Sequence, residues 1–172
     1  MSSTTNNQEH VWGNPNGPIE LIEYADYQCP YCRQAYYMLK EVKKQLGNDL
    51  KFVFRNFPIP ELHAHAIHAA VVAEIAGAQD KFWEMHDTLF ENQKKLDDPY
   101  LFKYAEDLGL DMKRFEEDLE NESFFRKVNQ DYESGIKKGV QGTPTFFING
   151  ELFNGNWMDP AFIGYLKTFA KK

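Results

Sequence analysis

The sequence predicts an α/β fold, built from a mixed four-stranded sheet with an inserted all-helical domain. Two short apolar runs flank a helical segment near the N-terminus, a long central stretch shows helical periodicity only, and a β-hairpin and a last helix close the chain. With 172 residues the chain is long enough for one domain carrying a large insertion and a core of its own.

The N-terminal part of the chain predicts one strand–helix–strand unit. Residues 1–17 are rich in Asn, Gly, Ser and Thr, and we expect them to form an N-terminal arm. Ile19–Tyr24 predicts the first strand. Pro30 suits the start of a helix that continues to Leu46. The alternating run Leu50–Phe54 predicts the second strand, and a right-handed crossover makes the two strands parallel.

The central part of the chain predicts five helices, and we assign residues 61–138 to the inserted helical domain. Breaks at Gly77, at Asp97 and Asp98, and at Gly109 separate the helices. The sheet domain is therefore discontinuous and consists of residues 18–60 and 139–172. The predicted helices are His63–Ala76, Lys81–Gln93, Pro99–Leu108, Asp111–Glu120 and Ser123–Lys138.

The C-terminal part predicts a hairpin and a helix. Thr145–Ile148 and Glu151–Phe153 are apolar runs joined by the pair Asn149-Gly150, which favours a tight turn because both central positions need a positive φ. The closing helix is expected over Asp159–Ala170, where the final lysines suit the negative end of its dipole. The hairpin completes the four-stranded sheet.

Charge and hydropathy exclude several classes of partner. The net charge of −7 and the pI of about 5.2 disfavour nucleic acid, which requires clustered Lys and Arg. The longest nearly apolar stretch, 69–78, contains Glu74 and is shorter than the roughly 20 residues of a membrane span. Residues 1–10 lack the basic and apolar regions of a secretory signal. We therefore expect a cytoplasmic chain as written, or a periplasmic or other extracytoplasmic one if the sequence is a mature form.

The two cysteines, Cys29 and Cys32, are the only ones in the chain and form a CXXC motif. A disulfide that closes so short a loop removes little entropy from the unfolded chain, so the pair suits redox exchange better than stabilisation. Cys29 is expected just before a helix, where free N–H groups and the helix dipole stabilise a thiolate. We therefore assign Cys29 as the attacking sulfur and Cys32 as the resolving one.

Two alternatives to redox exchange stay open for this pair. A zinc site needs four ligands, and His63, His65 and His68 would have to complete it. We instead expect these histidines at the surface or at helix caps, and no metal. The second alternative is that both cysteines are simply small buried residues.

These residues resemble the thioredoxin-fold disulfide oxidoreductases and, within them, the DsbA-like branch, over nearly all of the chain from Val11 onward. The resemblance rests on residues 18–32 with the CXXC motif, on 82–86 and on 139–150. It implies a thioredoxin-like sheet in which Pro144 is cis and packs against the CXXC motif, while Thr143 pairs with an extended substrate peptide. An ordinary trans proline at the start of the strand is the alternative.

Further residues of the site follow from the same resemblance. Glu23 matches an acid that family members bury near the second sulfur, where it exchanges a proton with Cys32. A position on the solvent face of the strand is the alternative. Pro30 and Tyr31 are expected to contact substrate. Strongly oxidising DsbA proteins have histidine in place of Tyr31, so we expect a potential less oxidising than about −120 mV, toward the glutaredoxin range of about −200 to −230 mV.

The resemblance implies a thiol-disulfide oxidoreductase that exchanges the Cys29–Cys32 disulfide with the cysteines of protein substrates. It implies a redox-recycling partner, no organic cofactor and no metal, with glutathione as a candidate redox partner. Oxidant, reductase and isomerase roles are all compatible with the motif. Two alternatives are a glutathione-dependent transferase or isomerase, which would not need Cys32, and a non-catalytic module that binds peptides near Pro144.

Overall fold

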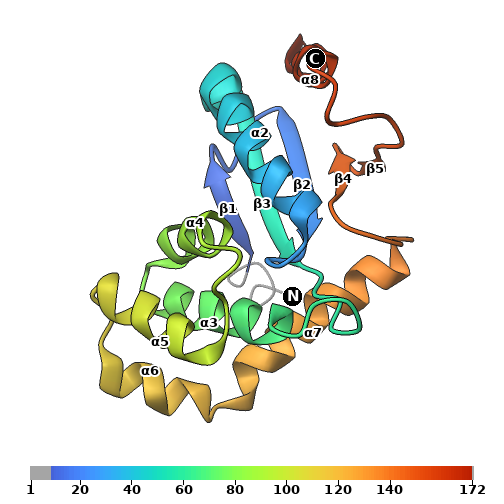
Figure 1. Cartoon of the computed structure of the whole chain (residues 1–172). Helices are drawn as coiled ribbons and strands as arrows, with labels where there is room; N and C mark the ends of the chain where they lie inside the picture. Colours follow the sequence, from blue (N-terminus) through green and yellow to red (C-terminus); the bar gives the residue numbers. More distant parts are fainter. Residues whose placement is uncertain (1–8, 172) are drawn as a thin grey trace.

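The computed structural model describes residues 9–171 and contains a five-stranded mixed sheet with helices around it (Figure 1). The spatial order of the strands is β1-β3-β2-β4-β5. β2 and β3 are parallel, and the other three pairs are antiparallel. The predicted α/β fold is confirmed. The strands are β1 (His10–Gly13), β2 (Ile19–Ala25), β3 (Leu50–Asn56), β4 (Thr145–Ile148) and β5 (Glu151–Leu152).

The sheet has one strand more than the four predicted. The additional strand is β1, whose residues we had placed in the N-terminal arm, and it pairs with β3 from His10 opposite Phe54 to Gly13 opposite Lys51. The arm was assigned from its turn-forming composition, whereas the ladder with β3 depends on a partner far along the chain. Residues 1–8 of the predicted arm lie outside the described residues.

The helices follow the predicted order with shifted boundaries. α3 begins at Ala66 rather than at His63, because residues 60–62 and 64–65 form turns. None of the helices within residues 9–171 has the length and apolar character needed to cross a bilayer. The helices are α2 (Pro30–Leu46), α3 (Ala66–Ala78), α4 (Phe82–Glu91), α5 (Asp98–Asp107), α6 (Met112–Leu119), α7 (Glu122–Lys137) and α8 (Ala161–Lys167).

The side chains of β2 alternate between two cores. Leu21 and Ala25 belong to the larger core, together with the buried residues of α2, α3, α4 and α8. Ile22 and Tyr24 belong to a smaller core on the other face. Since successive strand residues point to opposite faces, Glu23 shares the face of Leu21 and Ala25, which α2 covers.

A buried polar cluster joins the sheet to the helical block. Lys127 Nζ lies 2.8 Å from Asp131 Oδ2 and 3.6 Å from Glu74 Oε2. Asn56 Nδ2 donates to Glu74 Oε2 at 2.8 Å and to Asp131 Oδ2 at 2.9 Å. His10 Nε2 lies 2.8 Å from Glu74 Oε2. These contacts pair the buried charges and connect β1, β3, α3 and α7.

Candidate functional site

The CXXC motif lies where β2 is followed by α2. Cys29 is the N-cap of α2, with extended backbone (φ −74°, ψ 123°), and Pro30 is the first helical residue. The Cys29 N–H donates to the carbonyl of Asp26 at 3.1 Å. Both cysteines are free thiols, and Cys32 in the first turn is completely buried. Cys29 is also largely buried but keeps 6 % of its surface accessible, so the helix start leaves Cys29 reachable and holds Cys32 behind it.

The two thiols have opposite ionisation tendencies. The pKa of Cys29 is lowered to about 6, chiefly by a hydrogen bond from the Cys32 thiol, and additionally by Thr143 and by backbone N–H groups of Tyr31 and Cys32. Burial raises the pKa of Cys32 well above its usual value, and the neighbouring Cys29 and Glu23 raise it further. At neutral pH the ionised form is therefore favoured at Cys29, while Cys32 keeps its proton.

Thr143, which precedes Pro144, contacts Cys29 from the other end of the chain. The Cys29 Sγ lies 3.6 Å from the carbonyl oxygen of Thr143, and the Thr143–Pro144 peptide bond is cis. The adjacent Thr145 begins β4 and pairs with Tyr24 of β2, which fixes this loop beside the CXXC motif. A hollow of about 440 Å³ lies beside the loop, and its lining includes Pro144, Phe153 and Trp157.

Pro30 and Tyr31, predicted to contact substrate, are exposed between the two cysteines. Tyr31 leaves 55 % of its surface accessible although it is a large apolar side chain. The structure therefore places both residues on the accessible side of the motif, opposite to the buried Cys32.

Glu23 lies on the buried face of β2 and is only 1 % exposed, so the alternative of a solvent-facing strand position is wrong. Burial raises its pKa to about 8, against the lowering effect of the Lys43 ammonium. Among the described residues, Glu23 Oε2 has no hydrogen-bond partner. Lys43 itself lies in an aromatic cage, where its Nζ is 5.0–5.2 Å from the ring centroids of Trp12, Phe52 and Trp83.

Asp26 is a site residue that the sequence analysis missed. Its backbone N–H donates to Cys32 Sγ at 3.4 Å. Its fully buried carboxylate accepts from the N–H of Gln28 at 2.7 Å, from the N–H of Ile59 at 2.8 Å and lies 2.9 Å from His63 Nδ1. These contacts fix the turn that aims the Asp26 N–H at the resolving sulfur. The sequence pattern that could have indicated Asp26 is an acid directly after the strand and three positions before the CXXC motif.

Gln93, which follows α4, is a second missed residue. Its amide donates to the carbonyl of Tyr27 at 2.9 Å and to that of Cys29 at 2.8 Å. Gln28 connects the same turn to the start of α3, because its side-chain oxygen accepts from the His65 N–H at 2.6 Å. The helical block thus holds the turn before Cys29 in place. No local sequence pattern distinguishes Gln93 from other polar residues of the block.

Two of the three histidines of the zinc alternative contact carboxylates outside the CXXC motif. His63 contacts Asp26, and His68 Nδ1 lies 2.8 Å from Asp98 Oδ1 at the surface. Across residues 9–171 no three His, Cys, Asp or Glu side chains are grouped so that they could hold a metal ion.

The sequence of this chain is similar to one protein family and to part of a longer protein. A family model described as Thioredoxin matches residues 5–167. A sodium/proton antiporter, NhaA 1 of Mycobacterium sp. (strain KMS), is 36 % identical over 152 residues, which are 87 % of this chain and 25 % of the antiporter. The chain therefore spans about a quarter of the length of this relative.

Solved structures share the fold over almost the whole chain. A thioredoxin-like oxidoreductase from Silicibacter pomeroyi DSS-3 superposes with a TM-score of 0.84 at 26 % identity and covers 99 % of this chain and 98 % of its own. The thiol-disulfide exchange protein α-DsbA2 from Wolbachia pipientis has a TM-score of 0.80 at 19 % identity, covering 96 % and 92 %. At the lower identity the likeness concerns the fold alone.

Proposed function

Since the chain belongs to the thioredoxin family, we propose that it is a DsbA-like thiol-disulfide oxidoreductase that exchanges Cys29 and Cys32 with the cysteines of protein substrates. The observation that carries the proposal is the pairing of a thiol of lowered pKa at the start of α2 with a buried thiol of raised pKa behind it. We propose no ion transport, because the match covers only about a quarter of the antiporter.

The first step is a displacement at sulfur. The Cys29 thiolate attacks a substrate disulfide, forms a mixed disulfide and releases one substrate cysteine as a thiolate, which takes a proton from solvent. The carbonyl of Thr143, 3.6 Å from the attacking sulfur, lies where an extended substrate strand could pair with it. The exposed rings of Pro30 and Tyr31, which follow Cys29 in the chain, offer apolar contact to the substrate.

The second step is resolution by Cys32. Its sulfur attacks Cys29, the Cys29–Cys32 disulfide forms, and the second substrate cysteine leaves as a thiolate. Cys32 must lose its proton in this step, and burial makes that costly. We assign Glu23 as the group that exchanges this proton: with a pKa of about 8 it is mostly protonated at pH 7, and its ionised fraction accepts the proton of Cys32. Run in reverse, the same steps oxidise a substrate dithiol, with Glu23 returning the proton to the departing Cys32.

The expected partners are protein thiols or disulfides and a redox-recycling partner, for which glutathione is a candidate. Neither step requires an organic cofactor or a metal. Tyr31 cannot supply the positive charge of the histidine found in strongly oxidising relatives, so the proposed potential lies toward about −200 to −230 mV.

Equilibration of the purified protein with glutathione buffers, read by thiol alkylation, tests the proposal. We expect one two-electron couple that disappears in Cys29→Ser. Cys32→Ser should accumulate a mixed disulfide with a cysteine-containing peptide, because the resolving step is removed. Absence of a redox-active couple in the wild-type protein would refute the proposal. Full turnover by Cys32→Ser would point instead to the glutathione-dependent transferase alternative.

A further inference from the structure

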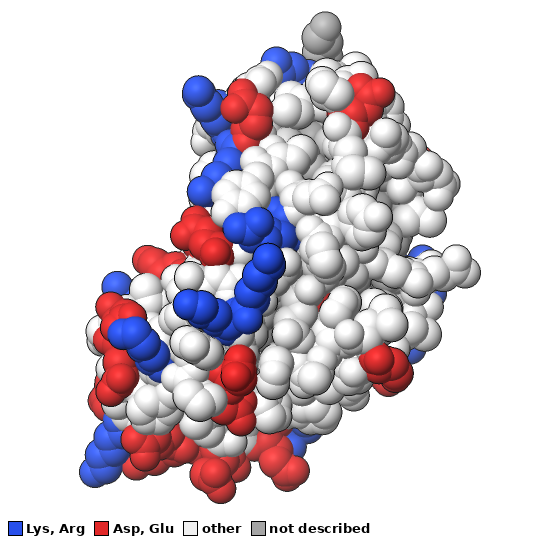
Figure 2. Space-filling model, in the orientation of Figure 1, with Lys and Arg blue, Asp and Glu red and all other residues white. Residues whose placement is uncertain are grey.

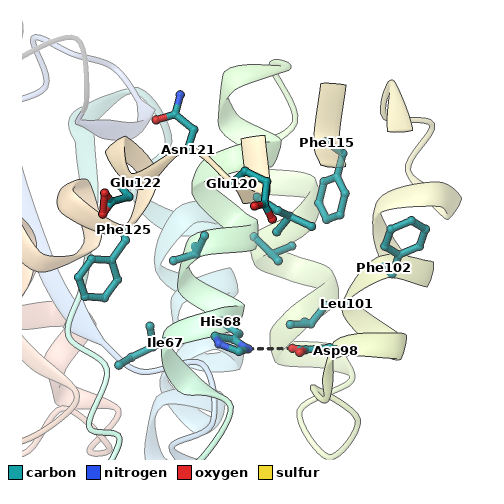
Figure 3. A pocket seen from close by; sticks show the side chains of 13 residues that line it. Ile67, His68, Asp98, Leu101, Phe102, Phe115, Glu120, Asn121, Glu122 and Phe125 are labelled. Atoms are coloured by element: carbon teal, nitrogen blue, oxygen red, sulfur yellow. Dashed lines mark hydrogen bonds and ion pairs between the residues drawn. The ribbon is translucent and has the colours of Figure 1, made fainter. Parts of the chain in front are cut away.

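The helical block carries an apolar groove away from the cysteines. A hollow of about 600 Å³ lies between α3, α5, α6 and the start of α7, which is within the size range of ligand pockets. Figure 3 shows Phe125 and Ile67 at one end of it and Phe102 and Phe115 at the other. Phe125 and Leu119 remain 48 % and 44 % exposed.

The groove continues toward the CXXC motif. A second hollow of about 200 Å³ shares Ile67 and Phe125 with the first and extends to Pro58 and Pro60. Between these prolines, the N–H of Ile59 binds the carboxylate of Asp26, whose own N–H contacts Cys32. A chain lying in the groove would therefore leave it close to the loop that supports the resolving cysteine.

The rim of the groove is acidic. Figure 3 shows Asp98, paired with His68, at one edge and Glu120 and Glu122 at the opposite edge. Residues 116–122 carry five carboxylates and no basic side chain, and Asp and Glu atoms gather along the lower margin of the molecule in Figure 2. No Lys or Arg lines either hollow.

We propose that this groove binds a segment of the protein substrate in which apolar side chains alternate with Lys or Arg. The apolar floor takes the apolar side chains, and the acidic rim attracts the basic ones. Binding beside the site would raise the effective concentration of the substrate cysteine near Cys29. The effect on the concentration of the substrate cysteine rests on the proposed function. The binding of a peptide in the groove is independent of it.

The same charges disfavour other occupants. An acidic rim repels the carboxylate of a fatty acid or the phosphate of an anionic lipid. It also repels a second copy of this chain, whose net charge is −7.

A cysteine-free, fluorescein-labelled peptide in which Phe and Leu alternate with Lys tests the inference by fluorescence anisotropy on the full chain. Phe125→Ala should weaken binding about tenfold or more, as expected for loss of an aromatic anchor. Ile136→Ala is the matched control, because Ile136 is equally exposed on the same helix but lies outside both hollows.

The rim is tested by the double variant Glu120→Gln/Glu122→Gln. We expect weaker binding and a reduced dependence on salt, whereas Glu133→Gln, an exposed carboxylate of α7 outside the groove, should bind like wild type. Replacing Lys by Glu in the peptide should abolish binding. Thermal unfolding of each variant verifies that it is folded.

Three results would overturn the inference: no binding by wild type, equal binding by the groove and control variants, or a Phe125-dependent dimer in sedimentation. Displacement of the peptide by a neutral detergent, with no effect of the rim variants, would also overturn it and assign the groove to a small apolar ligand. Exchange of wild-type Cys29 with oxidised glutathione is measured separately. If peptide binds but no exchange occurs, the proposed function fails while the binding inference stands.

Discussion

Replacing Glu23 by Gln tests the electrostatic description of the site most directly. Gln preserves the shape of the buried side chain but removes its ionisation. In the wild-type protein the pKa of Glu23 is about 8, because burial disfavours the charged form, against an ordinary value of 4.5. The folded protein therefore holds a proton at pH 7 that the unfolded chain releases.

The size of the effect follows from proton linkage. Below pH 4.5 both states hold the proton and the raised pKa has no effect on stability. As the pH rises from 4.5 to 8, the unfolded state gains from ionisation and the folded state does not, so wild type loses stability. pH 7 lies about 2.5 pH units above the ordinary pKa of 4.5, so the loss of unfolding free energy at pH 7 is roughly 3 kcal/mol. Glu23→Gln should therefore gain roughly 3 kcal/mol relative to wild type between pH 4 and pH 7.

Urea unfolding of the reduced proteins at pH 4, 5.5 and 7 measures this difference. Glu41→Gln is the control, since Glu41 lies exposed on α2 and its removal should give a nearly constant difference. The difference in unfolding free energy between Glu23→Gln and wild type should vary with pH more than that of the control. Equal variation would refute the conclusion that Glu23 is buried and protonated. Slower resolution of the mixed disulfide by Glu23→Gln is the accompanying kinetic expectation, checked by rapid quench at pH 7.

Three further predictions concern the surroundings of the motif. Cys32→Ala removes the hydrogen bond that contributes most to lowering the pKa of Cys29, so the midpoint of its alkylation rate should move from about 6 to above about 7; an unchanged midpoint would contradict this cause. Tyr31→His should shift the potential toward about −120 mV in glutathione buffers, and an unchanged potential would remove Tyr31 as a determinant. Asp26→Asn should lower the free energy of unfolding by about 1–3 kcal/mol in urea, because a buried acceptor of several hydrogen bonds is impaired. Asp98→Asn, which affects an exposed Asp–His pair, should change it by less than about 0.5 kcal/mol, and equal effects would contradict the role of burial.

The elements with strong local patterns were predictable from the sequence. The Asn149-Gly150 turn adopts positive φ at both residues, and Gly47 ends α2 with a φ of 49°. The strand β1 was not predictable in this way, because its pairing depends on β3 and its residues follow no apolar alternation. The expected membership of the thioredoxin family is confirmed by the family match, and the solved structures share the fold.

The candidate site was predictable where its residues are close in sequence or belong to a known motif. The CXXC motif and Thr143 follow from such patterns, and the structure brings them together. The contact of Asp26 with His63 joins residues 37 positions apart, and that of Gln93 with Cys29 joins residues 64 apart. Contacts of this kind arise from tertiary packing and leave no local periodicity.

The buried cluster around Lys127 limits how this protein can be divided or recombined. A fragment containing only residues 61–138 would keep Glu74 and Asp131 with a single ammonium between them, and would lose His10 and Asn56. Two carboxylates would then share one ammonium, while their remaining partners, His10 and Asn56, are encoded elsewhere in the chain. Transplanting the helical block into another sheet therefore requires the strands β1 and β3 to travel with it.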